Sequence, residues 1–341
     1  MSGSGEIVVA EFRPALASEW KRFLETSNNG TLFHDLDFLA YHPADRFDEH
    51  HLLVRQEGKL LAILPAAIVT DSRGDRYLQS PYGASTGGIV VQEKTRLETL
   101  TGVVAAIKAH IARSALAGAV LRLGPSVYMR RPDQSLEFAL AAEGFRLTAR
   151  WLCLIESLEA ANAGDEGLLQ QFTQSKRYDV RAALREGLAA SEAGPEALDR
   201  FYDLLLGTMD RHDAQPTHDK KEIGVLYRLV PGRLRLFFCT AGNVDLSAIL
   251  VFMLNGVAAC TFYICGKRKQ SATALLLHHI MQVLAREGIR YLDLGPSASS
   301  VHVNRGNVQF KEGFGARGFC RDEWRWDATG APSANAMGSH A

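Results

Sequence analysis

The chain has 341 residues, 47% of them hydrophobic, and its 38 Lys and Arg residues are balanced by 38 Asp and Glu residues. This length allows two domains with large buried cores. The zero net charge excludes the broad basic field that attracts nucleic acid or anionic membranes, although a local basic patch remains allowed, so we expect no DNA partner.

No targeting or membrane-spanning segment is predicted. The start, MSGSGEIVV, lacks a basic stretch followed by an apolar one. The longest apolar runs, such as residues 248–254, are far shorter than the roughly 20 residues that span a bilayer. The five cysteines form no C-x-x-C pair and lie mostly in apolar runs, which predicts reduced, buried thiols and a cytoplasmic protein. The small, polar tail at residues 329–341 is predicted to be disordered.

Apolar periodicity and turn residues in the first half predict a helix, antiparallel strands, a helix, a strand, a helix and a strand. The expected helices cover residues 17–26, 35–41 and 97–115 and a segment that ends at residue 142. The expected strands are two within residues 51–69 around a turn at Gly58 and Lys59, two within residues 76–91, one at residues 121–126 and one at residues 146–155.

A linker at residues 160–166 leads into the second half. Helices are expected at residues 175–188, 195–210 and 222–229, followed by strands at 233–242, 245–256 and 257–266, a helix at 272–286, a strand at 291–297, a loop, an aromatic and glycine-rich segment at 310–319 and a closing strand at 321–326. The three successive strands are apolar almost throughout, which indicates burial on both faces.

The motif Leu-x-Leu-Gly-Pro-Ser occurs at residues 121–126 and again at residues 292–297, which is 171 positions later (292 − 121). A predicted helix precedes each copy, and an aromatic and glycine-rich segment with a Trp-containing strand follows each one. A repeat at half the chain length predicts a duplicated fold with a boundary near residues 160–166.

Several short motifs occur in a fixed order. They are SP-x-G-x-S-x-x-G at residues 80–88, R-x-x-V-R-x-A-x-x-x-G at 177–187, T-x-x-R-H at 208–212, the pair Phe262-Tyr263, and LDLG followed by FK-x-x-F-G at 310–315. Together they make the chain resemble tandem acyltransferases of the GNAT superfamily, in particular the FemABX-type proteins and their relatives with a BioF2-like acetyltransferase domain. The resemblance covers residues 17–327. It implies an α/β (α+β) fold of two tandem GNAT-like domains, at residues 6–160 and 166–328, each with a mixed, mostly antiparallel sheet flanked by helices.

The resemblance also implies an N-acyltransferase, in which an amine attacks the ester or thioester of a donor held mainly by the second domain. No tightly bound cofactor is implied, and the co-substrate is acyl-CoA or aminoacyl-tRNA. The acceptor would be a cell-envelope, polysaccharide or small-metabolite amine. The peptidoglycan-acting members tend to have Asp-Pro where this chain has Gly124-Pro125, so an acceptor contact made by that Asp is missing, which argues against a peptidoglycan precursor.

Three residues are the catalytic candidates. Phe310 and Lys311 match the family's C-terminal Phe-Lys pair, and a fixed lysine can stabilise the oxyanion of aminolysis. The alternative for Lys311 is an ordinary surface lysine. Asp293 lies on the strand face opposite to Leu292 and Leu294, where it could orient or deprotonate the amine, or it could be solvent-facing or ion-paired.

Donor binding is predicted at the basic turn that leads into the helix at residues 272–286. Its residues are Lys267, Arg268, Lys269 and Ser271. A helix N-terminus after such a turn suits phosphate groups, although a solvated turn is the common alternative. The usual acetyl-CoA signature R/Q-x-x-G-x-G/A is absent, which favours tRNA, whereas the zero net charge disfavours it.

The predicted substrate-binding residues share polar or aromatic character and lie in the motifs above. They are Tyr263, Arg177, Arg181, Thr208, Arg211, His212, Ser80 and Tyr82. For Tyr263 the alternative is a plain core aromatic. Arg177, Arg181 and Arg185 share one helix face, which could equally be a solvated surface.

No metal site is expected, because the adjacent pairs His50-His51 and His278-His279 cannot both face one site and no H-E-x-x-H or cysteine cluster occurs. The absence of a G-x-S-x-G motif also leaves a serine hydrolase without support. The rival function is a non-catalytic module that keeps the duplicated fold and binds a peptide or glycan.

Overall fold

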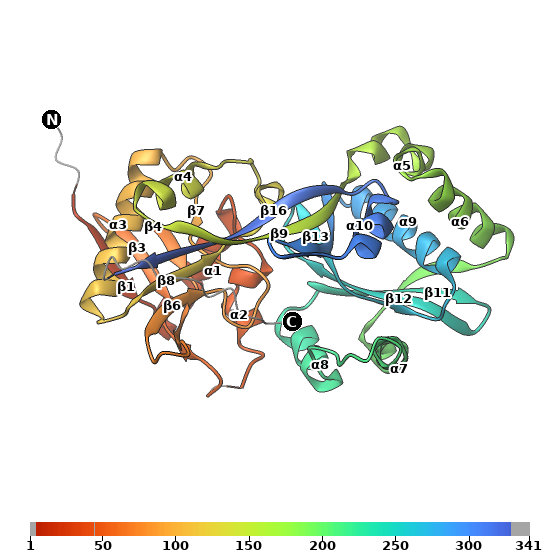
Figure 1. Cartoon of the computed structure of the whole chain (residues 1–341), viewed down its shortest axis with the longest axis horizontal. Coiled ribbons are helices and arrows are strands. Elements are labelled where there is room, and N and C mark those ends of the chain that lie inside the picture. The colour runs from red at the N-terminus through yellow and green to blue at the C-terminus, as the bar shows by residue number, and fades with distance from the viewer. Residues whose placement is uncertain (1–4, 44, 329–341) are drawn as a thin grey trace.

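Two halves lie end to end along the long axis of the molecule, as Figure 1 shows for the computed structural model, which describes residues 5–43 and 45–328. The first half contains β1 (Ile7–Glu11), α1 (Ala17–Thr26), α2 (Leu36–Leu39), β2 (Asp48–Glu49), β3 (Leu52–Gln56), β4 (Lys59–Leu64), β5 (Ala67–Thr70), β6 (Arg76–Ser80), β7 (Val90–Val91), α3 (Leu97–Arg113), β8 (Gly118–Arg122), α4 (Ser135–Ala142) and β9 (Arg146–Ser157). The second half contains α5 (Asp165–Gln171), α6 (Gln174–Arg185), β10 (Ala189–Ala193), α7 (Leu198–Asp210), α8 (Lys220–Leu229), β11 (Leu234–Ala241), β12 (Val244–Met253), β13 (Ala258–Gly266), α9 (Gln270–Arg286), β14 (Tyr291–Ser299), β15 (His302–Val303), α10 (Arg305–Glu312) and β16 (Arg317–Asp327). The tail that was predicted to be disordered, residues 329–341, lies outside the described residues.

Local sequence accounts for most of these elements. Helix α1 has the predicted bounds, and it ends where the backbone N–H of Ser27 donates to the carbonyl of Leu24. Strands β1 and β10 were not predicted, and most of their side chains are exposed. They form by pairing with the apolar strands β3 and β11.

Other details also differ from the sequence expectation, including α10, which forms over residues expected to be a loop and an aromatic segment. Strand β14 continues to Ser299, because it pairs with β9 again after an irregularity at Pro296, and residues expected to be a loop form β15 beside it. Cys320 is exposed, whereas the other four cysteines are buried as predicted. Alternate residues of a strand face opposite sides, and Phe319 takes the inward position on β16.

A single sheet of 12 strands runs through both halves in the order β10-β11-β12-β13-β14-β9-β16-β8-β6-β5-β2, with β15 beside β14. A smaller sheet, β1-β3-β4-β7, completes the first half. Strands β11 to β13 are buried on both faces, as predicted: Leu236 and Phe238 belong to one apolar cluster, and Phe237 and Cys239 to another.

The last strand of each half pairs with the sheet of the other half. Strand β9 ends the first half but pairs with β14, and β16 ends the second half but lies between β9 and β8. These two long strands cross the middle of the molecule in Figure 1. We propose residues 6–160 and 166–328 as the two units, with β9 and β16 exchanged between them. The exchange fixes the first motif copy and the second within one continuous sheet.

Replacing Gly118 with alanine is expected to weaken the pairing of β8 with β16. A Cβ atom on Gly118 would lie 2.0 Å from the backbone oxygen of Trp326, so the two strands would have to move apart. We expect the free energy of unfolding to fall by about 1–3 kcal/mol, measured as a lower urea midpoint. Gly256→Ala is the matched control, because no atom lies within 4 Å of its Cβ position; an equal loss in both variants would contradict the predicted clash.

Helices cover both faces of the second half of the sheet. Helix α9 packs on one face with α5 and α6, and α7 and α8 pack on the other (Figure 1). The cluster on the second face continues into the first half, where Phe33 and Phe38 lie edge-on to Phe252 with ring centroids 6.2 and 5.9 Å away. The halves therefore share an apolar core and do not merely touch.

Within the described ranges, no helix is both long and apolar enough to cross a membrane.

Candidate active site

Strands β13 and β14 separate in the middle of the sheet. They pair in parallel only over residues 258–260 and 291–293. Beyond Cys260 and Asp293, β13 stays paired with β12 while β14 pairs with β9. The strand edges that face the gap carry backbone N–H and C=O groups, which a bound molecule can pair with as a strand would.

Both strands are irregular beside this gap. Strand β13 has a bulge, since Tyr263 pairs with Leu250 but Thr261 pairs with Val251, leaving Phe262 without a partner in β12. On β14, Gly295 adopts a φ of +88°, a conformation that L side chains rarely take. Bulges bend a strand and redirect its groups, and they are common next to active sites.

A cavity of about 830 Å³ opens from the gap and lies between the two halves. The first half contributes Thr86, Arg122 and Tyr128 to its wall, and the second half contributes Asp293, Lys311 and Arg321 together with the apolar side chains of Cys260, Ile264 and Leu294. A large concave site lined by a few convergent polar groups is where small molecules usually bind to proteins.

Asp293 of the second motif copy contacts Tyr128, which follows the first copy, in the wall of the cavity. The Tyr128 hydroxyl donates a short hydrogen bond to Oδ2 of Asp293, and the backbone N–H of Gly295 donates to Oδ1 at 2.6 Å. Asp293 is only 4% exposed, so the alternative of a solvent-facing carboxylate is wrong. Its position opposite to Leu292 and Leu294, which pack into the α9 cluster, is as predicted.

Lys311 is a buried lysine on α10. It is 5% exposed, so the alternative of an ordinary surface lysine is wrong. Its Nζ donates to the carbonyls of Gly295 and Pro296 at 2.9 and 3.3 Å. Its neighbour Phe310 packs edge-to-face against Phe314 with ring centroids 5.2 Å apart and is not among the residues that line the cavity. Phe310 therefore holds α10 in place, and Lys311 faces the site.

Burial shifts the proton affinities of these groups in opposite directions. It lowers the pKa of Lys311 to about 8, against the opposing effect of Asp293. It raises the pKa of Asp293, although the hydrogen bond from Tyr128, the Gly295 N–H and the charge of Lys311 hold part of the shift back. Such perturbed groups facing one cavity are typical of catalytic sites.

Two arginines of the cavity wall flank the ring of Trp151. The guanidinium carbons of Arg122 and Arg321 lie 4.7 and 5.1 Å from the Trp151 ring centroid. Arg122 donates to Glu323 at 2.7 Å, whereas no ion pair of Arg321 is found among the described residues. The Nε atoms of both arginines are buried without a hydrogen-bond partner in that same part of the chain. The wall is thus prepared for an anion.

A second cavity of about 390 Å³ adjoins the first, and Phe33, Arg122 and Phe262 line both. His218 lies in its wall, with Nε2 2.7 Å from the hydroxyl of Tyr41. Burial lowers the pKa of His218. The hydroxyl of Tyr263, a predicted substrate contact, instead accepts the backbone N–H of His218 at 3.1 Å, which places Tyr263 behind the wall.

The predicted donor-binding residues lie at the connection of β13 to α9. Lys267 and Arg268 are exposed, Ser271 is in the first turn of α9, and none of these three lines either cavity. Lys269 forms a short ion pair with Glu186. Only Lys267 and Arg268 are therefore available as exposed cations at this helix start.

The predicted arginine stripe on α6 is largely engaged by its own surroundings. Arg177 donates to the carbonyl of Phe172 at 3.1 Å, Arg181 lies 3.6 Å from Glu166, and Arg185 stacks over Tyr178. None of the three arginines lines the cavities. The stripe and the cavity are separate features of the molecule.

The motif at residues 208–212 ties α7 to the end of β13. The backbone N–H of Gly266 donates to Oγ1 of Thr208 at 3.0 Å, and Arg211 donates to the carbonyl of Gly266. His212 is exposed just after α7. Thr208 and Arg211 therefore fix the strand end that leads to the α9 N-terminus.

Ser80 and Tyr82 hold the glycine-containing loop of the first half in place. Ser80 is fully buried, donates to the carbonyl of Pro65 and accepts the N–H of Gly88 at 2.8 Å. The Tyr82 hydroxyl lies 3.3 Å from both Glu49 and His51. Neither lines the cavities, whereas Ser85 and Thr86 of the same loop do.

Sequence reasoning missed Tyr128 and Arg321. Tyr128 follows the first motif copy by two residues, and a comparison of the copies beyond their last serine would have singled it out. Arg321 lies in the closing strand, and only the exchange of β16 brings it to the cavity.

Comparisons with known proteins bear on the fold. Residues 174–312 match the family model described as acetyltransferase (GNAT) domain. No curated protein sequence matches the chain. Among solved structures, the crystal structure of FemX is 13% identical over 94% of this chain and 97% of that one, with a TM-score of 0.70. L-PGS from Bacillus licheniformis is 12% identical over 96% and 95%, with a TM-score of 0.59, and a tandem GNAT protein from the clavulanic acid biosynthesis pathway is 13% identical over 96% and 100%, with a TM-score of 0.53. At these identities the structural likeness shows the fold, and it confirms the expected tandem architecture.

Proposed function

From the match of residues 174–312 to a GNAT acetyltransferase domain and the FemX-like fold of the whole chain, we propose that the protein is a tandem, FemABX-like N-acyltransferase that moves an acyl group from a thioester donor to an amine on an anionic acceptor. The observation that carries the proposal is the buried group of Asp293, Tyr128 and Lys311 at the gap between β13 and β14. A gap in a sheet can hold the donor's chain, and the buried polar groups stand where its acyl end would lie.

The chemistry requires one bond to form and one to break. The acceptor nitrogen adds to the thioester carbonyl, the tetrahedral oxyanion collapses, and the C–S bond breaks to release the donor thiolate. Lys311, protonated at neutral pH, stabilises the negative charge on the oxygen. The proton lost by the amine passes to the Tyr128 and Asp293 pair, whose carboxylate has a raised pKa and so accepts it more readily.

The paired surface cations favour acyl-CoA over aminoacyl-tRNA as the donor. tRNA binding depends on many unpaired cations that neutralise phosphates, whereas Arg181 and Lys269 are already paired with Glu166 and Glu186. The two exposed cations Lys267 and Arg268 at the start of α9 suit a single pyrophosphate. A donor of this kind also fits a cytoplasmic protein.

The acceptor we propose carries a carboxylate or phosphate near its amine. The guanidinium of Arg321, which forms no ion pair with the described residues, lies beside Arg122 and provides the charge, and the Trp151 ring between them keeps both groups oriented. A small metabolite fits this description, and so does a sugar or envelope precursor with an acidic group.

Arg321→Gln is expected to raise the KM for such an acceptor by about 10- to 100-fold, the range that corresponds to a lost charged hydrogen bond. The KM for the same amine without its acidic group should not change. Arg146→Gln is the matched control, because Arg146 is exposed and paired with Asp327. Equal effects on both amines, or equal effects of both substitutions, would argue against an anion site. Carboxylate and phosphate acceptors assayed in parallel identify the group.

The experiment that tests the function is a transfer assay followed by mass spectrometry. The purified protein is incubated with acyl-CoA or aminoacyl-tRNA and a panel of acidic and neutral amines. Acylated acidic amine formed from acyl-CoA supports the proposal. Transfer from aminoacyl-tRNA alone would contradict the donor assignment. Tight binding of a peptide or glycan without transfer from either donor would favour the non-catalytic module.

A further inference from the structure

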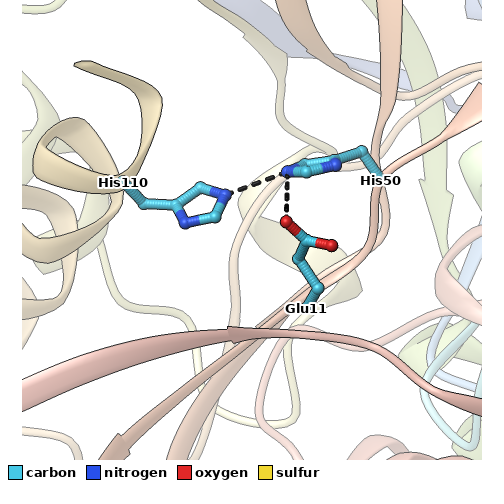
Figure 2. Close-up of side chains that lie close together, drawn as sticks. All are labelled: Glu11, His50 and His110. Carbon is cyan, nitrogen blue, oxygen red and sulfur yellow. Dashed lines mark hydrogen bonds and ion pairs between the residues drawn. The ribbon is translucent and has the colours of Figure 1, made fainter. Parts of the chain in front are cut away.

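A second group of side chains converges in the first half, away from the cavities. Glu11 at the end of β1, His50 in the connection from β2 to β3, and His110 on α3 point toward one another, as Figure 2 shows. The Nε2 atoms of the two histidines are 2.9 Å apart, and Nε2 of His50 lies 3.9 Å from Oε1 of Glu11. None of the three lines a cavity described above.

These groups have the chemistry of a zinc site. Imidazole nitrogens bind Zn²⁺ at about 2.0–2.1 Å and carboxylate oxygens at about 2.0–2.2 Å. Two nitrogens on one tetrahedral ion are then about 3.3 Å apart, so the present separation of 2.9 Å has to widen only slightly to admit one. In the contact between the Nε2 atoms one neutral ring donates and the other accepts, and both nitrogens can bind a metal when the donating ring takes its other tautomer, with the proton on Nδ1.

The protein scaffold holds the three ligands from separate elements. Glu11 pairs with Leu52 in the β1 and β3 ladder, and the backbone N–H of His50 donates to the carbonyl of Ala66 at 2.8 Å. His110 is buried on α3. Glu11 is exposed, so a water molecule can reach the fourth position from solvent.

We propose that Glu11, His50 and His110 bind one Zn²⁺ ion, with water as the fourth ligand, and that the ion ties the edge strand β1 to α3. No sequence motif marks this site, because its ligands are single residues far apart in the chain. His51, the neighbour of His50, points into the aromatic core against Trp20 and Tyr82. The site is independent of the proposed acyl transfer.

Titration calorimetry with ZnCl₂ and the chelator-treated full chain tests the proposal. We expect one ion per chain with a Kd of about 1 µM or tighter, and binding at least about 100-fold weaker in His50→Gln and in His110→Gln. Saturating Zn²⁺ should raise the Tm of the wild type but not of these variants. His302→Gln, which removes an exposed histidine on β15, is the matched control and should bind as the wild type does.

The proposal is overturned if the wild type binds no Zn²⁺ in this range, or if His50→Gln and His110→Gln bind it as well as His302→Gln does. A spectrum of the wild type with Co²⁺ needs no substitution and guards against variants that fail to fold. Intense visible absorption typical of four-coordinate Co²⁺ supports the site, and the weak spectrum of the hydrated ion counts against it.

Discussion

Replacing Lys311 with methionine is expected to lower kcat by about 10²- to 10³-fold, the loss that follows removal of one oxyanion donor in an acyl-transfer site. Methionine fills much of the space of the lysine stem, so α10 should stay packed while the charge disappears. The Kd of the donor should change little, because the charge that Lys311 stabilises exists only in the transition state. Steady-state kinetics and donor titration measure the two quantities. Lys94→Met, at an exposed lysine in the first half, should behave as the wild type does.

The pH dependence follows from the same residue. Wild-type activity should fall as the pH rises through about 8, because the pKa of Lys311 is lowered to about 8 and only its protonated form stabilises an oxyanion. This descending limb should be absent from the residual activity of Lys311→Met. A variant that retains wild-type kcat, or the same limb in both proteins, would contradict the role.

Lys311→Met should also be more stable than the wild type at pH 7. A lysine in the unfolded chain keeps its proton up to a pH of about 10, whereas in the folded protein it loses the proton near pH 8. Between these values the unfolded state binds more protons, so the free energy of unfolding rises with pH. Below pH 8 the charged, buried lysine therefore lowers stability, and thermal unfolding at pH 7 should give a higher Tm for the variant.

Asp293→Asn has the second largest expected effect. An amide cannot accept the amine proton, so we expect kcat to fall by about 10²-fold or more, within the range for general acid-base groups. The asparagine side chain has nearly the same shape and can still accept the Tyr128 hydroxyl through its oxygen, so packing is preserved. Since burial raises the pKa of Asp293, its ionised form lowers stability at neutral pH, and the variant should melt no lower than the wild type.

Combining Tyr128→Phe with Asp293→Asn tests whether the two residues act together in catalysis or independently. The Tyr128 hydroxyl and Asp293 share one hydrogen bond, so the double variant should lose little more activity than Asp293→Asn alone. Losses that multiply would show that the two groups act separately. A decrease in kcat below about threefold in Asp293→Asn, with its fold intact, would remove Asp293 from the mechanism.

The repeated motif has a role that its sequence alone did not reveal. Its two copies meet at the cavity, where the first contributes Arg122 and the following Tyr128, and the second contributes Asp293. The opposite charges at the matching positions, Arg122 and Asp293, therefore line one site and do not mark two separate ones. Matching positions of the two copies thus contribute a cation, Arg122, and a carboxylate, Asp293, to the same cavity.

Local sequence patterns predicted the features that depend on residues close together in the chain. The bounds of α1, the burial of β11 to β13 on both faces and the side of β14 on which Asp293 lies all follow from apolar periodicity. The exchange of β9 and β16 did not, because strand pairing between distant segments leaves no periodic signal. For the same reason Arg321 on β16 was missed. The roles of Thr208, Ser80 and Tyr263 in holding loops and strand ends could not be separated from substrate binding.

A crystal structure of the wild type with a non-hydrolysable acyl-CoA analogue tests the central claim most directly. We expect the acyl group in the gap between β13 and β14, with its carbonyl oxygen facing Lys311, and the pyrophosphate of the analogue near the start of α9. An analogue bound elsewhere, or no binding in the gap at saturating concentration, would contradict it.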